Sequence, residues 1–310
     1  MPWDDKISRR LKLKDLQTLM AVIEAGGIGK AADRLNHSQP AISKAIASLE
    51  RTLGKRLFER GRKGIELTPY GDAMLKCGTA VFDDLRKGVE EVDFLADPAA
   101  GEIRIACTEP VFVGIVSAII SRFVRQYPRV VFDVVLRDAF AIYRDLDTRT
   151  VDLVIAQASA PIDTMHMQQE ILYHERVVVV AGAHHPFARK RRLTLAELVN
   201  EAWVLPPRRS FITSLVIEAF RAIGLSAPRI AVFMQGSRLM LVASNQLLTV
   251  VPTVMLKAGA KYLSIKALPI ELPSNRRPVS LVTLKNRALS PVAQLFIEHA
   301  RAVANAIAKD

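Results

Sequence analysis

The sequence predicts a mixed α/β chain in three parts: a helix-rich N-terminal domain (residues 1–69), one long helix (residues 70–98) and a two-lobed α/β domain (residues 102–310). Three observations predict this fold class. Short helical patterns separated by turns fill the chain up to about Thr68, one uninterrupted amphipathic stretch follows Pro69, and short strands alternate with helices from Glu102 onward. A chain of 310 residues, half of them hydrophobic, is long enough to bury more than one core.

The N-terminal domain is predicted to begin with three short helices. Apolar residues recur at helical spacing in the first, and Gly26 and Gly27 end it (Leu13, Leu16, Leu19, Met20, Ile23). Ala31, Ala32 and Leu35 indicate the second helix. The third covers Ser38–Glu50, with Ser38 as its N-cap and Pro40 in its first turn, where a missing N–H has no cost.

A tight loop follows the third helix. Gly61 and Gly64 mark it, and Ile65–Leu67 is expected to return from it as a strand. Three basic residues flank these glycines: Arg60, Arg62 and Lys63. The loop is therefore a candidate wing.

The second and third helices meet the requirements of a helix-turn-helix. The motif needs small residues where the helices cross, a tight turn, and polar side chains on the exposed N-terminal face of the second helix. Ala31 and Ala32 are small, Asn36 and His37 form the turn, and Ala41, Ile42 and Ile46 are expected to pack inward. Gln39, Ser43 and Lys44 form the polar face. The alternative is a plain helical hairpin with a solvated charged face.

The polar residues of this motif have the chemistry of DNA contacts. Glutamine can bond an adenine edge in a bidentate way, lysine can reach guanine acceptors or phosphate, and serine is adaptable. The basic wing residues could follow phosphates or enter a minor groove. The residues therefore predict a winged helix-turn-helix that reads the major groove.

At this point the sequence resembles a family. The run GIGKAADRLNHSQPAISKAIASLERTLGKRLFERGRKGIELTPYGDAML looks like the N-terminal domain of LysR-type transcriptional regulators. The residues from Ser38 to Ser43, including Pro40, fall on the family pattern, as do Leu49–Glu50 and Leu57–Phe58. The match is dense over about 60 residues and weaker beyond residue 100, where Gly101–Ile105, Val151–Ile155 and His185–Phe187 continue it.

The resemblance implies a sequence-specific DNA-binding transcriptional regulator with a two-lobed effector domain, like that of periplasmic binding proteins. A small molecule would bind between the lobes. It also implies homodimers or homotetramers, a pseudo-palindromic double-stranded operator, and contact with RNA polymerase if the output is activation. The implied DNA contacts include Ser38 and Pro40. No cofactor and no catalytic residue are expected.

One position departs from the family pattern. The helix before the recognition helix usually opens with a small hydroxyl residue, whereas this chain has Gly27–Lys30 there. Glycine is a weaker N-cap than serine or threonine. Lys30 is expected to compensate by reaching a phosphate.

The stretch 70–96 carries an apolar stripe close to a heptad repeat: Met74, Val81, Leu85, Val92 and Leu95. The stripe has two interpretations, a helix packed on its own domain or a dimerising helix, and we favour the dimer because no neighbouring segment is long enough to cover it. Residues 97–101 are expected to form a linker.

The pattern from Glu102 indicates βαβ units and a parallel sheet. Strands are expected near 103–106, 130–136, 151–156, 177–181, 203–205, 230–232, 248–251 and 279–283, with a last helix over 292–307. Two lobes with two chain crossings suit this order better than one large sheet. Lobe one is expected to combine 102–170 with 276–310, and lobe two to cover 171–275.

Effector contacts are expected where strands end and helices begin, because ligands of α/β folds bind at the carboxyl ends of strands and anions bind at helix N-termini. The candidates are Thr108, Glu109, Gln157, Ser159, Arg209, Ser210, Gln235 and Ser237. For each residue alone the alternative is ordinary surface solvation, and for Thr108 a helix cap without ligand. The carboxylate of Glu109 disfavours an anion, whereas Arg209 and its neighbour Arg208 favour a carboxylate.

The net charge of +12 favours a polyanionic partner. Residues 1–70 carry six more basic than acidic side chains, and residues 99–310 carry ten more. The larger basic excess therefore lies in the effector region, where it serves either an anionic ligand or no specific partner.

The remaining features exclude other classes. The two cysteines, Cys77 and Cys107, allow one disulfide at most and suit a reducing cytoplasm; Cys107 is either a redox sensor or, as we favour, a small buried residue. From the sequence pattern we expect no signal peptide, no membrane span, no metal site and no catalytic constellation. The rival functions are an enzyme or solute-binding protein with an incidental helical N-terminus, and an architectural DNA binder without an effector.

Overall fold

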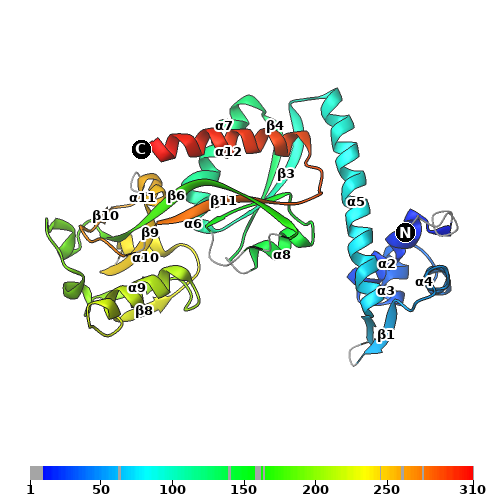
Figure 1. The fold of residues 1–310 in the computed structure, drawn as a ribbon, viewed down its shortest axis with the longest axis horizontal. Helices are drawn as coiled ribbons and strands as arrows, with labels where there is room; N and C mark the ends of the chain where they lie inside the picture. Colours follow the sequence, from blue (N-terminus) through cyan, green and yellow to red (C-terminus); the bar gives the residue numbers. More distant parts are fainter. Residues whose placement is uncertain are drawn as a thin grey trace. The chain divides into compact units, whose positions relative to one another are not determined.

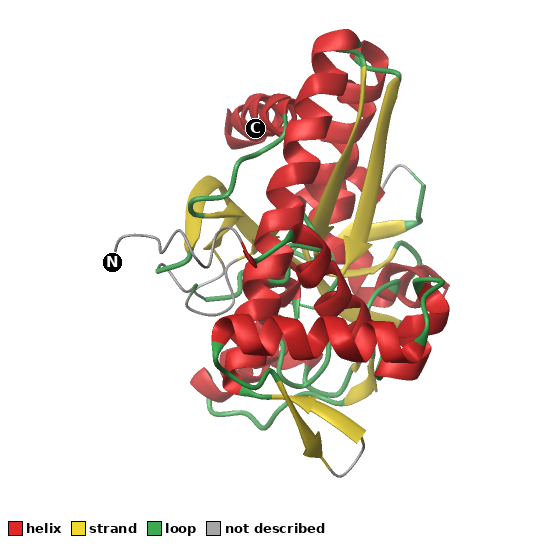
Figure 2. Cartoon of the chain, turned by 90° about the vertical axis from the view of Figure 1, so that its right-hand side faces the viewer, coloured by secondary structure: helices red, strands yellow, loops and turns green. Residues whose placement is uncertain are grey.

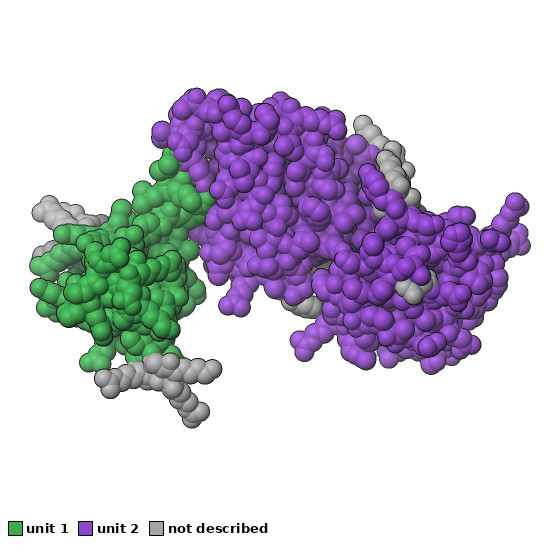
Figure 3. Space-filling view, turned by 180° about the vertical axis from the view of Figure 1, so that it is seen from behind, with its two compact units in different colours: residues 1–89 green, residues 90–310 purple. Residues whose placement is uncertain are grey.

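The computed structural model describes residues 10–61, 64–138, 141–157, 162, 165–244, 246–259, 262–273 and 276–309. The chain divides into two compact units, Met1–Val89 and Glu90–Asp310, which are coloured separately in Figure 3. Each unit is described by itself.

The N-terminal unit contains three short helices followed by a hairpin (Figure 1). The elements are α2 (Leu13–Ala25), α3 (Ile28–Arg34), α4 (Gln39–Leu53), β1 (Phe58–Gly61) and β2 (Gly64–Leu67). The two strands pair antiparallel and are drawn in yellow in Figure 2. The apolar faces of the helices share one core that includes Leu19, Ile42 and Leu49. The predicted three helices and wing are thus present.

Local sequence sets the ends of these helices. Gly26 and Gly54 end α2 and α4 in the left-handed conformation, with φ of 70° and 64°, which glycine adopts at little cost. Ser38 caps α4 as predicted, since its side chain accepts a hydrogen bond from the backbone N–H of Ala41. Ala41 itself is exposed, so the expectation that it packs inward was wrong. Ala41 lies on the exposed side of the first turn of α4, beside the polar residues, whereas Ile42 is buried in the core.

The long helix α5 runs from Pro69 to Ala96. Thr68 precedes it, and its hydroxyl accepts a hydrogen bond from the N–H of Gly71 at 3.1 Å. The predicted apolar stripe divides: Met74 packs against the N-terminal core, whereas Leu85, Val92 and Leu95 are exposed by 48%, 65% and 78%. Val89 is exposed beside them. The second half of the stripe therefore has no cover within the described residues.

The C-terminal unit is built on a sheet in two halves. The first half contains β3 (Ala100–Cys107), β4 (Arg129–Leu136), β5 (Leu153–Gln157) and β11 (Arg276–Leu284). Its helical segments are α6 (Glu109–Val111), the π-helical turn η1 (Phe112–Val116), α7 (Ser117–Gln126), α8 (Ile142–Asp147) and α12 (Pro291–Lys309). Alternate residues of β3 face opposite layers: Ile103, Ile105 and Cys107 pack with α7 and α12, and Ala106 packs with α8. Figure 1 shows α7 and α12 together beside this half.

The second half contains β7 (Ala202–Leu205), β8 (Ile230–Phe233), β9 (Leu247–Pro252) and β10 (Ile265–Ala267). Its helical segments are η2 (Pro186–Arg189), η3 (Leu195–Leu198), α9 (Phe211–Ala222), α10 (Arg238–Ser244) and α11 (Thr253–Gly259). Val177, Trp203 and Leu248 pack on the α9 side, while Val180, Val204 and Val251 pack on the α10 side.

One long strand, β6 (Met167–Gly182), joins the two halves. It pairs antiparallel with β11 over its first part and with β9 over its second part. The described strands consequently form one hydrogen-bonded path in the order β4-β3-β5-β11-β6-β9-β7-β8. The two predicted lobes are thus present, but the path through β6 and β11 joins their strands into one sheet. The strand predicted near 177–181 begins earlier, at Met167. Polar residues interrupt Met167–Arg176, so no continuous apolar run marked it as a strand.

The path also corrects the expected all-parallel sheet. The predicted βαβ units are parallel, since β3 pairs parallel with β4 and β5, and β7 with β8 and β9. The two strands that cross between the halves, β6 and β11, pair antiparallel with each other and with β5 and β9. The βαβ pattern predicts parallel pairing only for strands that a helix connects. β6 and β11 cross between the halves as strands, so the pattern does not apply to them.

Candidate functional site

The first candidate site is the exposed face of α4. Gln39, Ser43 and Lys44 are exposed, whereas Ile42, Ile46 and Leu49 on the opposite face are buried. Ser38 and Pro40 are also exposed at the start of the helix. The helix therefore presents polar side chains to solvent while its apolar stripe holds it on the N-terminal core.

Two interactions hold α4 in place. The Glu50 carboxylate accepts a hydrogen bond from the backbone N–H of Leu57 at 2.7 Å, which joins the end of α4 to the segment before the wing. At the other end, α3 packs against α4 close enough that a Cβ at Gly29 would lie 4.0 Å from Oε1 of Gln39. A rigid support of this kind favours a defined set of contacts by the exposed face.

The other predicted DNA contacts lie around α4 or outside the described residues. Lys30 is exposed on α3, whose N-cap Gly27 makes no side-chain capping hydrogen bond, as the sequence predicted. Arg60 lies on β1, but its side chain is not described, and Arg62 and Lys63 lie outside the described residues.

The second candidate site is a cavity of about 1050 Å³ between the two halves of the C-terminal unit. Seven of the eight predicted effector contacts line it: Thr108, Glu109, Gln157, Arg209, Ser210, Gln235 and Ser237. Ser159 lies outside the described residues. The structure thus brings together residues from four separate segments of the sequence.

Secondary structure explains this convergence. Thr108 follows β3 and Gln157 ends β5, and these neighbouring strands pair in parallel, so their carboxyl ends reach the same edge of the sheet. Ser210 caps α9, accepting a hydrogen bond from the N–H of Ile212 at 3.2 Å. Gln235 and Ser237 lie in the turn that leads into α10.

The cavity wall also contains charged residues outside the predicted set: Arg137, Asp138, Glu218, Arg238 and Arg277. Arg137 and Asp138 follow β4, so the strand-end rule that selected Thr108 could have found them. Arg277 lies at the start of the antiparallel strand β11, for which the rule gives no signal. Its guanidinium stacks 3.6 Å from the centre of the Phe211 ring.

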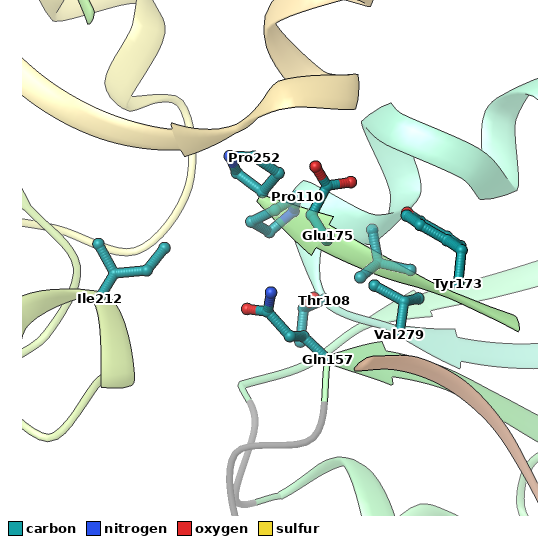
Figure 4. A pocket seen from close by; sticks show the side chains of 9 residues that line it. Thr108, Pro110, Gln157, Tyr173, Glu175, Ile212, Pro252 and Val279 are labelled. Carbon is teal, nitrogen blue, oxygen red and sulfur yellow. The ribbon is translucent and has the colours of Figure 1, made fainter. Parts of the chain in front are cut away.

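A smaller pocket of about 40 Å³ is shown in Figure 4. It shares Thr108, Pro110, Gln157 and Ile212 with the cavity. Glu175 of β6 lines it and is 4% exposed. Burial raises the pKa of the Glu175 carboxyl, while hydrogen bonds from the backbone of Val254 and Thr253 oppose the shift. The Thr253 N–H donates to Glu175 Oε1 at 3.0 Å, so this carboxyl holds the start of α11.

Cys107 lies at the end of β3, next to this pocket. It is fully buried, and burial raises the pKa of its thiol to about 12. A thiol with this pKa is not ionised near neutral pH, which favours the small buried residue over the redox sensor. Within the described residues, no cluster of side chains suits a metal ion, and no helix is long and apolar enough to cross a membrane.

Comparisons with known proteins match both parts of the chain. Residues 13–72 match the family described as "Bacterial regulatory helix-turn-helix protein, lysR family", and residues 96–305 match "LysR substrate binding domain". The chain is 28% identical over 302 residues to the transcriptional regulator GbpR of Azospirillum brasilense, covering 96% of this chain and 88% of GbpR.

Two further comparisons extend this likeness. PcaQ of Agrobacterium fabrum, another transcriptional regulator, is 30% identical over 214 residues, which cover 69% of this chain and 68% of PcaQ. The fold is similar to that of full-length CbnR crystallised with its target DNA, with a TM-score of 0.65 and 23% identity over 94% of this chain and 100% of CbnR.

Proposed function

Because the chain belongs to the LysR family of bacterial regulatory helix-turn-helix proteins, we propose that α4 enters the major groove of an operator and reads it through Gln39, Ser43 and Lys44. The observation that carries this proposal is the division of α4 into an exposed polar face and a buried apolar face. The glutamine and lysine contact base edges, and the serine adapts to either a base or a phosphate.

The surrounding residues position the domain on the duplex. Lys30, Ser38 and Pro40 contact the sugar-phosphate backbone beside the groove, and Arg60, Arg62 and Lys63 of the wing follow the backbone or the minor groove. Phosphate contacts of this kind fix register and supply salt-dependent affinity without specifying sequence. The protein acts where its operator lies, in the cytoplasm.

The cavity between the lobes binds a small-molecule effector. Thr108, Glu109, Gln157, Ser159, Arg209, Ser210, Gln235 and Ser237 are its proposed contacts. The cavity volume suits a metabolite-sized ligand, and its wall contains hydroxyl, amide and charged groups from both lobes. The site binds its ligand without transforming it. Effector binding regulates DNA binding if the two lobe arrangements differ in effector affinity.

The exposed half of the α5 stripe forms a dimer interface with a second copy of this chain. A dimer presents two recognition helices, which matches a pseudo-palindromic operator. The double substitution Leu85→Glu, Val92→Glu should shift the equilibrium from dimer toward monomer, because charges on an apolar helix interface oppose association. Analytical ultracentrifugation measures this shift.

DNase footprinting of the chromosomal region around the gene tests the DNA assignment. The triple substitution Gln39→Ala, Ser43→Ala, Lys44→Ala should abolish the footprint while the oligomer stays intact. The control is Gln17→Ala on the exposed face of α2, which should leave the footprint unchanged. An unchanged footprint with the triple variant would show that another element reads the DNA.

The effector assignment has its own test. A metabolite that binds the cleft should raise the melting temperature of the chain and change the extent of the footprint. Turnover of the metabolite would instead indicate an enzyme. Salt-steep binding that is indifferent to sequence would favour the architectural DNA binder.

A further inference from the structure

A hydrogen bond joins the two lobes across the effector cavity. Glu109 begins α6 in the first half of the sheet, and Ser237 lies in the turn before α10 in the second half. Oε1 of Glu109 accepts a hydrogen bond from the backbone N–H of Ser237 at 2.6 Å. Both residues line the cavity, so the chain places its own carboxylate in its ligand site.

The turn that receives this carboxylate has an unusual backbone. Ser237 has a φ of 47°, a left-handed conformation that serine rarely adopts, and Gly236 before it has a φ of 74°. A Cβ at Gly236 would lie 3.5 Å from Oε2 of Glu109. A positive φ at a serine is strained and persists where the surroundings hold it. The turn therefore wraps closely around a carboxylate.

Arg238, the residue after Ser237, is a second group that attracts the Glu109 carboxylate. We call the Ser237 amide and the Arg238 guanidinium together the carboxylate seat. The Arg238 side chain is 3% exposed and lines the cavity, and its Nε has no hydrogen-bond partner among the described residues. Burial lowers the pKa of its guanidinium, and attraction to Glu109 opposes that shift. A buried N–H without an acceptor is costly, and a planar carboxylate is the acceptor that a guanidinium matches best.

The rest of the wall in the second lobe contains two more arginines, Arg208 and Arg209, and one carboxylate, Glu218. The Arg208 guanidinium stacks 4.3 Å from the centre of the Phe233 ring, and Arg209 beside it is exposed. The N-terminus of α9, a helix of 12 residues, opens into the cavity at Phe211. Helix N-termini and guanidinium groups both favour negative charge.

We propose that the effector of this cleft bears a carboxylate that takes the place of the Glu109 carboxylate at the Ser237 amide and the Arg238 guanidinium. This proposal rests on the proposed function and adds to it the chemical class of the effector and the residue with which it competes. Glu109 belongs to one lobe and its receiving groups to the other. Replacement therefore removes one bond between the lobes, and this couples effector binding to their arrangement.

Chemical rescue tests the proposal without an identified effector. Glu109→Ala removes the internal carboxylate from the full chain, and sodium acetate supplies one from solution. The melting temperature of Glu109→Ala should rise with acetate concentration beyond its value in sodium chloride of equal ionic strength. The wild-type chain should show a smaller difference between the two salts, because its own carboxylate occupies the seat.

Glu218→Ala is the matched control. Glu218 also lines the cavity, but its removal leaves the bond between Glu109 and Ser237 intact. The acetate effect should be absent from this control and should disappear from Glu109→Ala when Arg238→Met is added. Equal effects of acetate and chloride on Glu109→Ala, or the same acetate effect in the control, would overturn the proposal.

The experiment still gives a result if Glu109→Ala is unstable, and it separates the effector proposal from the DNA-binding proposal. If Glu109→Ala does not fold in chloride, recovery of folded chain from refolding in acetate supports the proposal, and recovery in neither salt overturns it. None of these measurements uses DNA. A failed rescue with a normal footprint rejects the carboxylate effector alone, whereas a successful rescue with no footprint rejects the regulator and keeps the carboxylate seat.

Discussion

The carboxylate of Glu50 accepts a hydrogen bond from the backbone N–H of Leu57 at 2.7 Å, and a longer one from Phe58 at 3.4 Å. These bonds join the last turn of α4 to the first strand of the wing. The two elements that we assign to DNA are therefore held to each other by one side chain.

Removing that side chain should loosen the N-terminal unit. Glu50→Ala leaves two part-buried backbone donors without their acceptor, at a cost of about 1–3 kcal/mol in the free energy of unfolding. Urea denaturation followed by circular dichroism measures this loss. Glu59→Ala, an exposed position on β1, serves as the control and should change stability little. Equal stabilities for the two variants would show that the Glu50 bonds contribute nothing.

The start of α5 depends on one glycine. A Cβ at Gly71 would lie 2.1 Å from the backbone oxygen of Leu57, which is too close for any side chain. Gly71→Ala should therefore destabilise the N-terminal unit by about 1–3 kcal/mol or prevent its folding.

Gly88 on the same helix offers the matched comparison. A Cβ there meets nothing within 4 Å, so Gly88→Ala should stabilise the helix by roughly 0.5–1 kcal/mol. Thermal unfolding of both variants reveals the opposite signs. A normal melting temperature for Gly71→Ala would contradict the close approach.

The buried carboxyl of Glu175 should make stability depend on pH. Its pKa is raised by burial, so the folded chain retains the proton to a higher pH than the unfolded chain. The stability that it contributes is complete below the unfolded pKa, near 4.5, and is lost as the pH rises through the folded pKa. The stability of Glu175→Gln relative to wild type should therefore increase from pH 4.5 to neutral pH.

Glu170 on the same strand gives the opposite sign. A hydrogen bond from Arg301 lowers its pKa, so its contribution is present above the unfolded pKa and is lost as the pH falls. Glu170→Gln should consequently lose stability relative to wild type as the pH rises from acid to neutral. Urea midpoints across this range test both variants, and parallel pH profiles for the two would refute the assignment.

Local patterns predicted much of this molecule. The helix ends at Gly26 and Gly54, the Ser38 cap and the βαβ strands follow from short-range rules that the sequence displays directly. Seven effector candidates converge on one cavity because strand ends and helix starts lie at the same edge of an α/β sheet.

Other features depend on contacts between distant segments. The polar stretch Met167–Arg176 becomes a strand because β11 pairs with it, and nothing in its own pattern reveals that partner. The sequence suggested that Glu109 disfavours an anion. The structure shows that this carboxylate accepts a hydrogen bond from the backbone N–H of Ser237 in the other lobe, a contact between residues 128 positions apart that no local pattern reveals.

The specificity of DNA binding tests the central assignment most directly. Once footprinting has located the operator, fluorescence anisotropy at fixed salt gives the ratio of specific to non-specific affinity. Gln39→Ala should lower this ratio by about 5-fold or more, since a bidentate base contact contributes roughly 1–3 kcal/mol of discrimination. Gln17→Ala on α2 should leave it unchanged. A ratio that Gln39→Ala leaves intact, or that both substitutions lower equally, would contradict the assignment of α4 as the element that reads the DNA.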